Sequence, residues 1–260
     1  MIKQAALIAL DAVDTVLGRR NELTPPRRLM FDGPRDPVVF RRNGEEFLSL
    51  YRDLCALQPH HRVLDVGSGI GRKTVPLLRY LDERGSYFGF DVAAEGIEWC
   101  QQHITAKHPG FRFQRVDVFN ARYNPTGRDK PGGFRFPCED ESFDFVSVQS
   151  VFTHMLTDDS AGYVAEIRRV LAPDGCCLSS FFLLNEEMNL FFLRGRRPAS
   201  ALIVSKLFFV FKRRISAFLS RSILSNSVML RPSVKIARSV LIFSPRGRSP
   251  ARPWPSGCLP

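Results

Sequence analysis

One short segment constrains the fold of this 260-residue chain more than any other. The apolar run 63–66 carries an acid at Asp65 and leads directly into alternate glycines at 67, 69 and 71. Glycine lets the backbone turn sharply and lets a ligand approach where a Cβ would collide. Backbone N–H groups at the start of a following helix bind polar or anionic ligand groups. The segment therefore predicts a strand and a loop that hold a nucleotide-like cofactor.

The spacing of the glycines separates two kinds of cofactor. A dinucleotide-binding loop of the form G-x-G-x-x-G that begins at Gly67 requires glycine at position 72, where this chain has Arg72. Asp65 lies two residues before the first glycine and suits a cationic, amino-bearing ligand better than a pyrophosphate. The pattern therefore favours a cofactor other than a dinucleotide.

Two further predicted strands also end in acids. The segment 87–91 ends at Asp91, which lies 20 residues after Gly71, and the segment 111–117 ends at Asp117. The carboxyl ends of parallel strands form one edge of the sheet, and doubly wound proteins bind ligands in the crevice there. Taken alone, Asp91 or Asp117 is also explained as a helix N-cap or a solvated turn residue. Together, the acids that end the three strands are expected to converge on one crevice.

The order of these elements resembles the class I S-adenosylmethionine-dependent methyltransferases. Residues 63–71 are similar to the first motif of that family, 142–149 to its fourth strand, and 166–175 to the helix and Pro-x-Gly turn before strand five. The resemblance implies an α/β fold with a doubly wound, mostly parallel Rossmann-like sheet and helices on both faces. It also implies further C-terminal strands, which the sequence predicts to be missing or irregular.

The resemblance implies S-adenosylmethionine as the cofactor, with Asp91 on the ribose hydroxyls and Asp117 on the adenine amino group. The residues placed around the cofactor in this way are Asp65, Gly67, Ser68, Gly69, Asp91, Val92, Asp117, Val118 and Gln149. Methyl transfer is an in-line displacement, so positioning and desolvation supply most of the rate. A general base is needed only where the acceptor must lose a proton, and His154 is the candidate. His154 is also explained as a capping or packing residue.

Apolar periodicity predicts a core helix over 45–57 and a crossover helix over 94–106. Pro76 fits only a first helical turn, so the helix after the glycine loop is expected to begin near Thr74. The stretch 120–142 is rich in Pro and Gly, and we do not expect a regular helix through it. Its place in the chain suits either a lid over the site or a surface loop.

Charge is distributed unevenly along the chain. The stretch 188–260 has no Asp or Glu and holds 14 of the 37 Lys and Arg residues. The rest therefore has 37 − 14 = 23 basic and 26 acidic residues, a net charge of −3, and the overall charge of +11 belongs to this stretch. It is interpreted as a basic amphipathic helix over 199–224 for an anionic membrane, as an arm for nucleic acid, or as an out-of-frame extension. Residues 228–230 and 234–243 are weak strand candidates.

The sequence thus predicts an N-terminal cap segment over 1–39, a methyltransferase domain over 40–188 and a basic, acid-free, irregular tail over 189–260. The expected activity is methyl transfer to an unidentified small-molecule acceptor, in the cytoplasm and without a metal. The six cysteines show no zinc-site or disulfide spacing. Two alternatives stay open: an inactive S-adenosylmethionine-binding protein, and an adaptor that binds membrane or nucleic acid through its basic tail.

Overall fold

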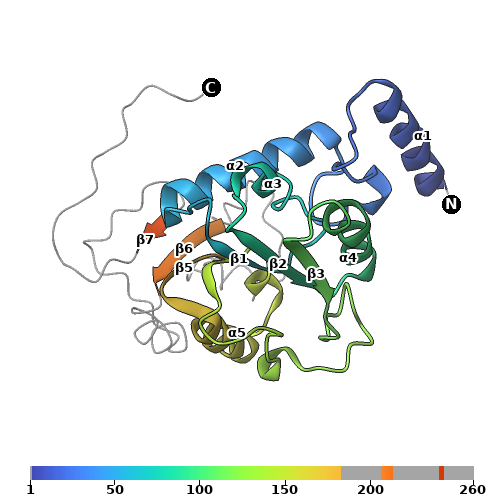
Figure 1. Ribbon diagram of the computed structural model, residues 1–260. Helices are drawn as coiled ribbons and strands as arrows, with labels where there is room; N and C mark the ends of the chain where they lie inside the picture. The colour runs from blue at the N-terminus through green and yellow to red at the C-terminus, as the bar shows by residue number, and fades with distance from the viewer. Residues whose placement is uncertain (1, 183–205, 213–239, 243–260) are drawn as a thin grey trace.

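The computed structural model describes residues 2–182, 206–212 and 240–242. Within these residues a seven-stranded sheet has the order β3-β2-β1-β4-β5-β6-β7 (Figure 1). Strands β1 to β5 are parallel, β6 is antiparallel to β5, and β7 is parallel to β6. The strands are β1 (Arg62–Val66), β2 (Ser86–Asp91), β3 (Phe111–Arg115), β4 (Phe143–Val148), β5 (Leu171–Phe182), β6 (Lys206–Lys212) and β7 (Val240–Ile242). The predicted doubly wound, mostly parallel sheet is confirmed.

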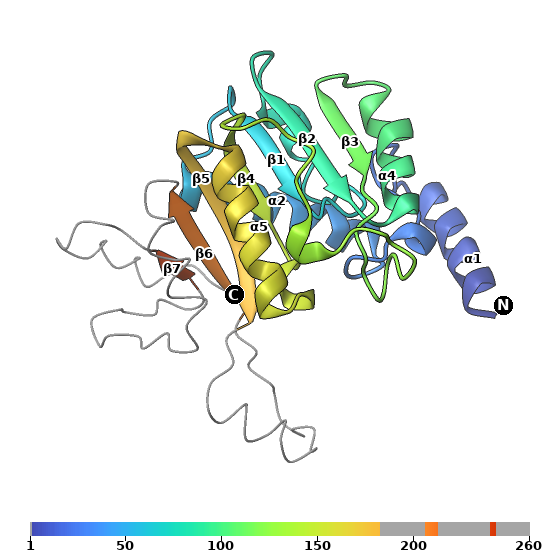
Figure 2. The same ribbon diagram turned by 90° about the horizontal axis from the view of Figure 1, so that it is seen from below.

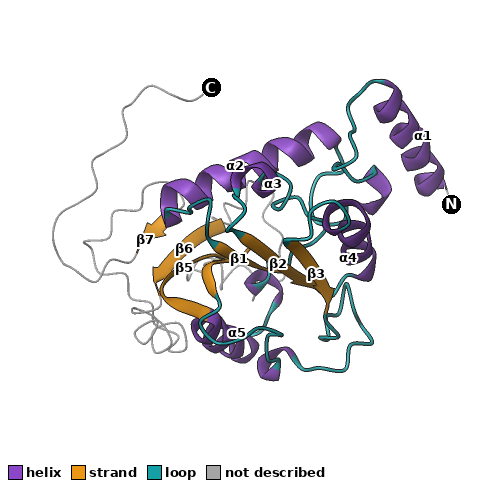
Figure 3. Cartoon of the chain, in the orientation of Figure 1, coloured by secondary structure: helices purple, strands orange, loops and turns teal. Residues whose placement is uncertain are grey.

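Helices cover both faces of this sheet (Figures 2 and 3). The α-helices of the described residues are α1 (Ile2–Val16), α2 (Pro37–Cys55), α3 (Leu77–Tyr80), α4 (Ala94–Cys100) and α5 (Thr157–Val170). A π-helical turn, Gln101–Thr105, continues α4, in agreement with the predicted crossover helix. Helix α5 lies on one face, and α2 crosses the opposite face (Figure 2).

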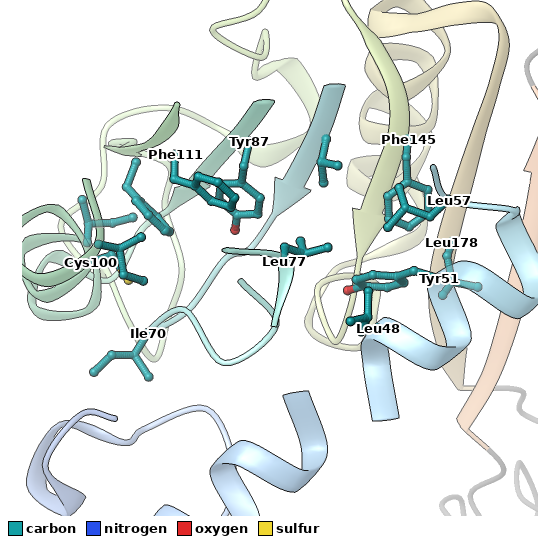
Figure 4. Packing of buried hydrophobic residues seen from close by; sticks show 14 of the residues in the cluster. Leu48, Tyr51, Leu57, Ile70, Leu77, Tyr87, Cys100, Phe111, Phe145 and Leu178 are labelled. Carbon is teal, nitrogen blue, oxygen red and sulfur yellow. The ribbon is translucent and has the colours of Figure 1, made fainter. Parts of the chain in front are cut away.

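Successive side chains of the central strands point into two different apolar cores, as the pleat requires. Val63 and Tyr87 belong to the core that α2, α3 and α4 cover (Figure 4). Leu64 and Val146, which are register partners in β1 and β4, belong to the core beneath α5. Burial of both strand faces explains why β1 and β4 carry apolar side chains on both of their faces.

Helix α2 is longer than predicted because its start is encoded by a cap. The Asp36 carboxylate accepts hydrogen bonds from the N–H groups of Val38 at 2.9 Å and Val39 at 3.0 Å, and Pro37 occupies the first turn. At the other end, the Tyr51 hydroxyl lies 2.8 Å from the Ser147 hydroxyl of β4. Helix α2 is thereby tied to the centre of the sheet.

The structure corrects two expected boundaries. Helix α3 begins at Leu77 rather than near Thr74, because buried contacts hold the side chains of residues 73 and 74 in a series of turns. Strand β5 begins at Leu171, directly after α5, so the expected turn at 173–175 lies within the strand. The pairing of β5 with β4 shifts register between Phe143 and Phe145 to accommodate it.

The C-terminal stretch contributes backbone to the sheet. Residues 206–212 form β6, so the amphipathic helix expected over 199–224 is wrong for these residues. Their run Leu-Phe-Phe-Val-Phe favours an extended conformation, and β5 offers an edge with which to pair. Strand β7 falls within the candidate 234–243, whereas 228–230 lies outside the described residues. None of the described helices has the length and apolar character needed to cross a membrane.

The stretch 120–142 has no α-helix, as predicted, and contains one short 3-10 turn at 131–133. Phe136 is fully buried in the core beneath α5, with Phe134 packed against it. Arg169 of α5 donates hydrogen bonds to the carbonyls of Phe136 at 3.1 Å and Cys138 at 2.8 Å. This part of the stretch therefore belongs to the core.

Candidate active site

The glycine loop leaves β1 at the carboxyl edge of the sheet. Gly67, Gly69 and Gly71 have φ angles of +74°, +59° and +78°, a region that disfavours residues with a Cβ. The N–H groups of Gly67 and Ser68 donate to the carbonyl of Phe90 at 3.0 and 3.1 Å, which joins the loop to the end of β2. A Cβ on Gly67 would lie 2.5 Å from Cγ2 of Val151. The glycines therefore permit the predicted sharp turn and the close packing of Val151 against the loop, whereas close approach of a ligand stays a prediction.

Asp91 lies at the end of β2, beside this loop, as predicted. Its Oδ2 accepts a hydrogen bond from the Gly69 N–H at 2.8 Å, and its Oδ1 accepts one from the Ala93 N–H at 2.9 Å. Burial raises the pKa of Asp91, and these two N–H donors oppose the rise. A carboxylate oxygen accepts about two hydrogen bonds, so each oxygen of Asp91 retains capacity for a ligand hydroxyl.

Asp65 is 1 % exposed and has protein partners on both oxygens. Its Oδ1 lies 3.0 Å from Nζ of Lys73, and its Oδ2 accepts from the Tyr87 hydroxyl at 3.0 Å. Burial raises the pKa of Asp65, with Lys73 acting in the opposite direction. Lys73 also donates to the Gly67 carbonyl at 2.9 Å, and Thr74 donates to the Tyr87 hydroxyl at 2.8 Å. Asp65 therefore braces the loop from within the protein, and a direct cofactor contact through it stays a prediction.

Two polar atoms near the strand ends have no partner. Ser68 Oγ and Gln149 Oε1 are buried and make no hydrogen bond within the described part of the chain, whereas Gln149 Nε2 donates to the Leu178 carbonyl at 2.9 Å. The two residues follow neighbouring strands, since Val66 of β1 is paired with Val148 of β4. Buried polar atoms without partners are uncommon in folded proteins. A polar ligand at the loop would satisfy them, so these residues fit a nucleotide-like cofactor.

Two distant segments meet beside the glycine loop. The Phe31 and Tyr123 rings lie 5.5 Å apart, which joins the N-terminal segment to the stretch 120–142. A Cβ on Gly69 would collide with the carboxylate of Asp32, and one on Gly96 would lie 3.0 Å from the Phe31 ring. These contacts place the N-terminal segment against the loop, in keeping with the cap segment expected over residues 1–39.

Asp117 lies after β3 and is 36 % exposed at the rim of the site. Arg128 donates to it at 2.6 Å and Asn124 at 3.2 Å, and these contacts lower the pKa of Asp117. Val118 is buried and Val92 is partly buried. The predicted cofactor residues thus lie at or just beyond the carboxyl ends of β1 to β4, except Asp65, which lies within β1.

His154 lies on the 3-10 helix Phe152–His154, beyond the end of β4, and is exposed. Tyr163 of α5 is buried against Phe134 and Phe136, and burial raises the pKa of its hydroxyl. In the ranges that the structure describes, no three His, Cys, Asp or Glu side chains gather as metal ligands.

A doubly wound sheet, a glycine loop after β1 and an acid at the end of β2 define a Rossmann-like protein with a nucleotide-cofactor site. Residues 63–175 match a protein family described as "Methyltransferase domain". This match and the similarity to curated methyltransferases support the class I S-adenosylmethionine-dependent methyltransferase family for this part of the chain.

The chain is similar to several known proteins. It is 28 % identical over 141 residues to the uncharacterized methyltransferase YcgJ of Bacillus subtilis, covering 54 % of this chain and 47 % of that protein. It is 30 % identical over 142 residues to a polyketide synthase-nonribosomal peptide synthetase of Aspergillus clavatus, covering 54 % of this chain and 3 % of that protein. The crystal structure of YcgJ aligns with a TM-score of 0.43 and 23 % identity, over 58 % of this chain and 56 % of that one. The chain spans less than half the length of the curated relatives it matches.

Proposed function

We propose that this chain transfers a methyl group from S-adenosylmethionine to a small-molecule acceptor by in-line displacement. The observation that carries the proposal is the carboxylate of Asp91, held 2.8 Å from the Gly69 N–H beside a glycine loop with positive φ angles. The unpartnered Ser68 Oγ and Gln149 Oε1 at the neighbouring strand ends support it. The match of residues 63–175 to a methyltransferase family supports the reaction class.

The bound cofactor would supply a methyl group that is already activated on a sulfonium. Gly67 and Gly69 supply the positive φ angles that shape the loop, and Asp91 has lone pairs for the two ribose hydroxyls. Asp117, at the rim, would accept from the adenine amino group, in keeping with the family resemblance. Ser68 Oγ and Gln149 Oε1 would each gain the hydrogen-bond partner that they lack among the described residues.

The remaining contribution of the chain is to position the acceptor and to exclude water, which supply most of the rate of such a displacement. The Phe31 and Tyr123 rings, 5.5 Å apart, form an apolar cover beside the glycine loop. An acceptor with a free lone pair needs no base. For an acceptor that must lose a proton, the exposed imidazole of His154 is the group we assign to take it.

We assign a small molecule rather than a macromolecule as the acceptor. The similarity to part of a polyketide synthase-nonribosomal peptide synthetase supports this class. The described residues outside the C-terminal stretch do not favour nucleic acid, because residues 1–187 carry 23 basic and 26 acidic side chains.

The test is turnover. The full chain is incubated with S-adenosylmethionine and pools of small amines, phenols and carboxylic acids, and S-adenosylhomocysteine is followed by mass spectrometry. We expect release that depends on at least one pool, that falls at least tenfold in Asp91→Asn and that is unchanged in Asp53→Asn, an exposed carboxylate on α2. A folded chain that binds the cofactor but releases no product with any pool would contradict methyl transfer.

A further inference from the structure

A cavity of about 340 Å³ lies beside Arg72, and none of the residues assigned to the cofactor lines it. Its lining residues come from the N-terminal half of α2, the segment 72–79, the loop that follows α1 and the loop before β3, and the cavity is partly open to solvent. Its volume is at the lower end of the roughly 300–1,000 Å³ that small-molecule sites occupy. The side chains that the argument uses are Phe40, Arg41, Arg72, Val75, Arg79 and His108.

Arg72 is the unusual member of this lining, because it is only 5 % exposed. Nη2 donates to Asp32 Oδ1 at 2.9 Å, and the guanidinium lies over the Phe40 ring at 4.7 Å. Nε and Nη1 are buried and have no hydrogen-bond partner among the described residues. A buried cation is costly unless its donors are satisfied. Arg72 thus presents two donors for which the described residues supply no acceptor.

The rest of the lining adds positive charge. Arg79 is paired with Glu45, the only acid of the lining that the structure describes. Arg41 donates to the carbonyl of Arg19, a neutral group, so its charge is not offset there. His108 completes the polar wall, and Phe40 and Val75 belong to the apolar part of the lining. The cavity therefore combines an excess of cations with apolar walls.

We propose that this cavity binds a small-molecule oxyanion, a carboxylate or phosphate attached to an apolar group, and that Arg72 Nε and Nη1 donate to its oxygens. Guanidinium groups match the oxygens of both anions and are weakly hydrated, which suits a buried contact. The neutral part of the ligand occupies the apolar walls. This assignment is independent of the proposed methyl transfer.

Calorimetric titration of the full chain tests the proposal with phenyl phosphate, benzoate and phenol. We expect saturable binding of at least one of the two anions and none of phenol, and the comparison of the anions identifies the preferred headgroup. Arg72→Gln should weaken binding at least tenfold, as expected for hydrogen bonds from a charged donor. Val75→Phe, which fills the cavity and keeps Arg72, should do the same. The control Arg42→Gln, an exposed partner of Glu46 that does not line the cavity, should leave binding unchanged.

Folding of each variant is checked by near-ultraviolet circular dichroism of the buried Trp99. If Arg72→Gln does not fold, Val75→Phe and Arg41→Gln decide the question. No saturable binding of either anion by the folded wild type would overturn the proposal. Binding that survives both Val75→Phe and the arginine variants would overturn it as well. So would complete displacement of the anion by S-adenosylmethionine, because the site would then be the cofactor's own.

Discussion

Replacing Lys73 with Met should destabilise the folded chain strongly. Lys73 Nζ lies 3.0 Å from Asp65 Oδ1, and the two side chains are 9 % and 2 % exposed. Removal of one partner from a buried ion pair costs about 3–5 kcal/mol, because the remaining charge stays buried without compensation. Met retains the length and apolar stem of Lys. The loss of stability is therefore due to the missing charge and not to a cavity.

The loss should depend on pH in a defined direction. Burial already raises the pKa of Asp65 above its ordinary value, and removal of Lys73 raises it further. A group whose pKa is higher in the folded state binds protons more tightly there, so its contribution to stability falls as the pH rises through that pKa. The deficit of Lys73→Met should therefore be largest at neutral pH and shrink as Asp65 becomes protonated. A second change, Asp65→Asn, should recover most of it at neutral pH.

Urea denaturation followed by the fluorescence of buried Trp99 measures these free energies of unfolding. The control is Lys107→Met, which removes an exposed ion pair with Glu22 and should change the free energy of unfolding little. A loss of less than about 1 kcal/mol in Lys73→Met, where a buried pair should cost several times more, would refute the reasoning. Failure of Asp65→Asn to restore stability would refute it too.

Three further changes test other parts of the structure. Gly69→Ala places a Cβ at φ +59° and against the Asp32 carboxylate, so we expect a loss of about 1–2 kcal/mol in urea denaturation, and an unchanged stability would contradict the strained geometry. Asp36→Ala removes the α2 cap at a cost of about 1 kcal/mol. The Val39 N–H lowers the pKa of Asp36, so this contribution is lost as the pH falls through that lowered pKa, and the two proteins should then converge in stability. Arg169→Met removes the donors that hold the long loop before β4, and limited proteolysis should cut that loop faster than in the wild type.

The strands and their terminal acids were predictable because their signals are local. Apolar runs that end in Asp65 and Asp91 gave the positions of β1 and β2, and the glycine spacing predicted the loop between them. The cap that starts α2 is also a local signal, since Asp36 precedes a proline and an apolar run, but it was missed and the helix was predicted only from residue 45. Each of these features depends on only a few consecutive residues.

The missed features depend on contacts between distant residues. Arg72 pairs with Asp32 from 40 positions earlier, and no local pattern indicated it. Lys73, two residues after Gly71, was the local sign that a cation could pair with Asp65. The burial of Lys73 results from the turns at 73–76, which the sequence did not predict. For residues 206–212, basic and apolar residues suited a helix as well as a strand, and pairing with β5 decides between them.

The central claim is that the loop at Gly67 and Gly69 binds S-adenosylmethionine. Calorimetric titration of the full chain with this cofactor tests it most directly, with NAD as the competing nucleotide and Asp53→Asn as the matched control. We predict saturable binding of S-adenosylmethionine and not of NAD, weakened at least tenfold by Asp91→Asn and unchanged by the control. A folded chain that does not bind S-adenosylmethionine, or that binds it equally well without the Asp91 carboxylate, would contradict the account.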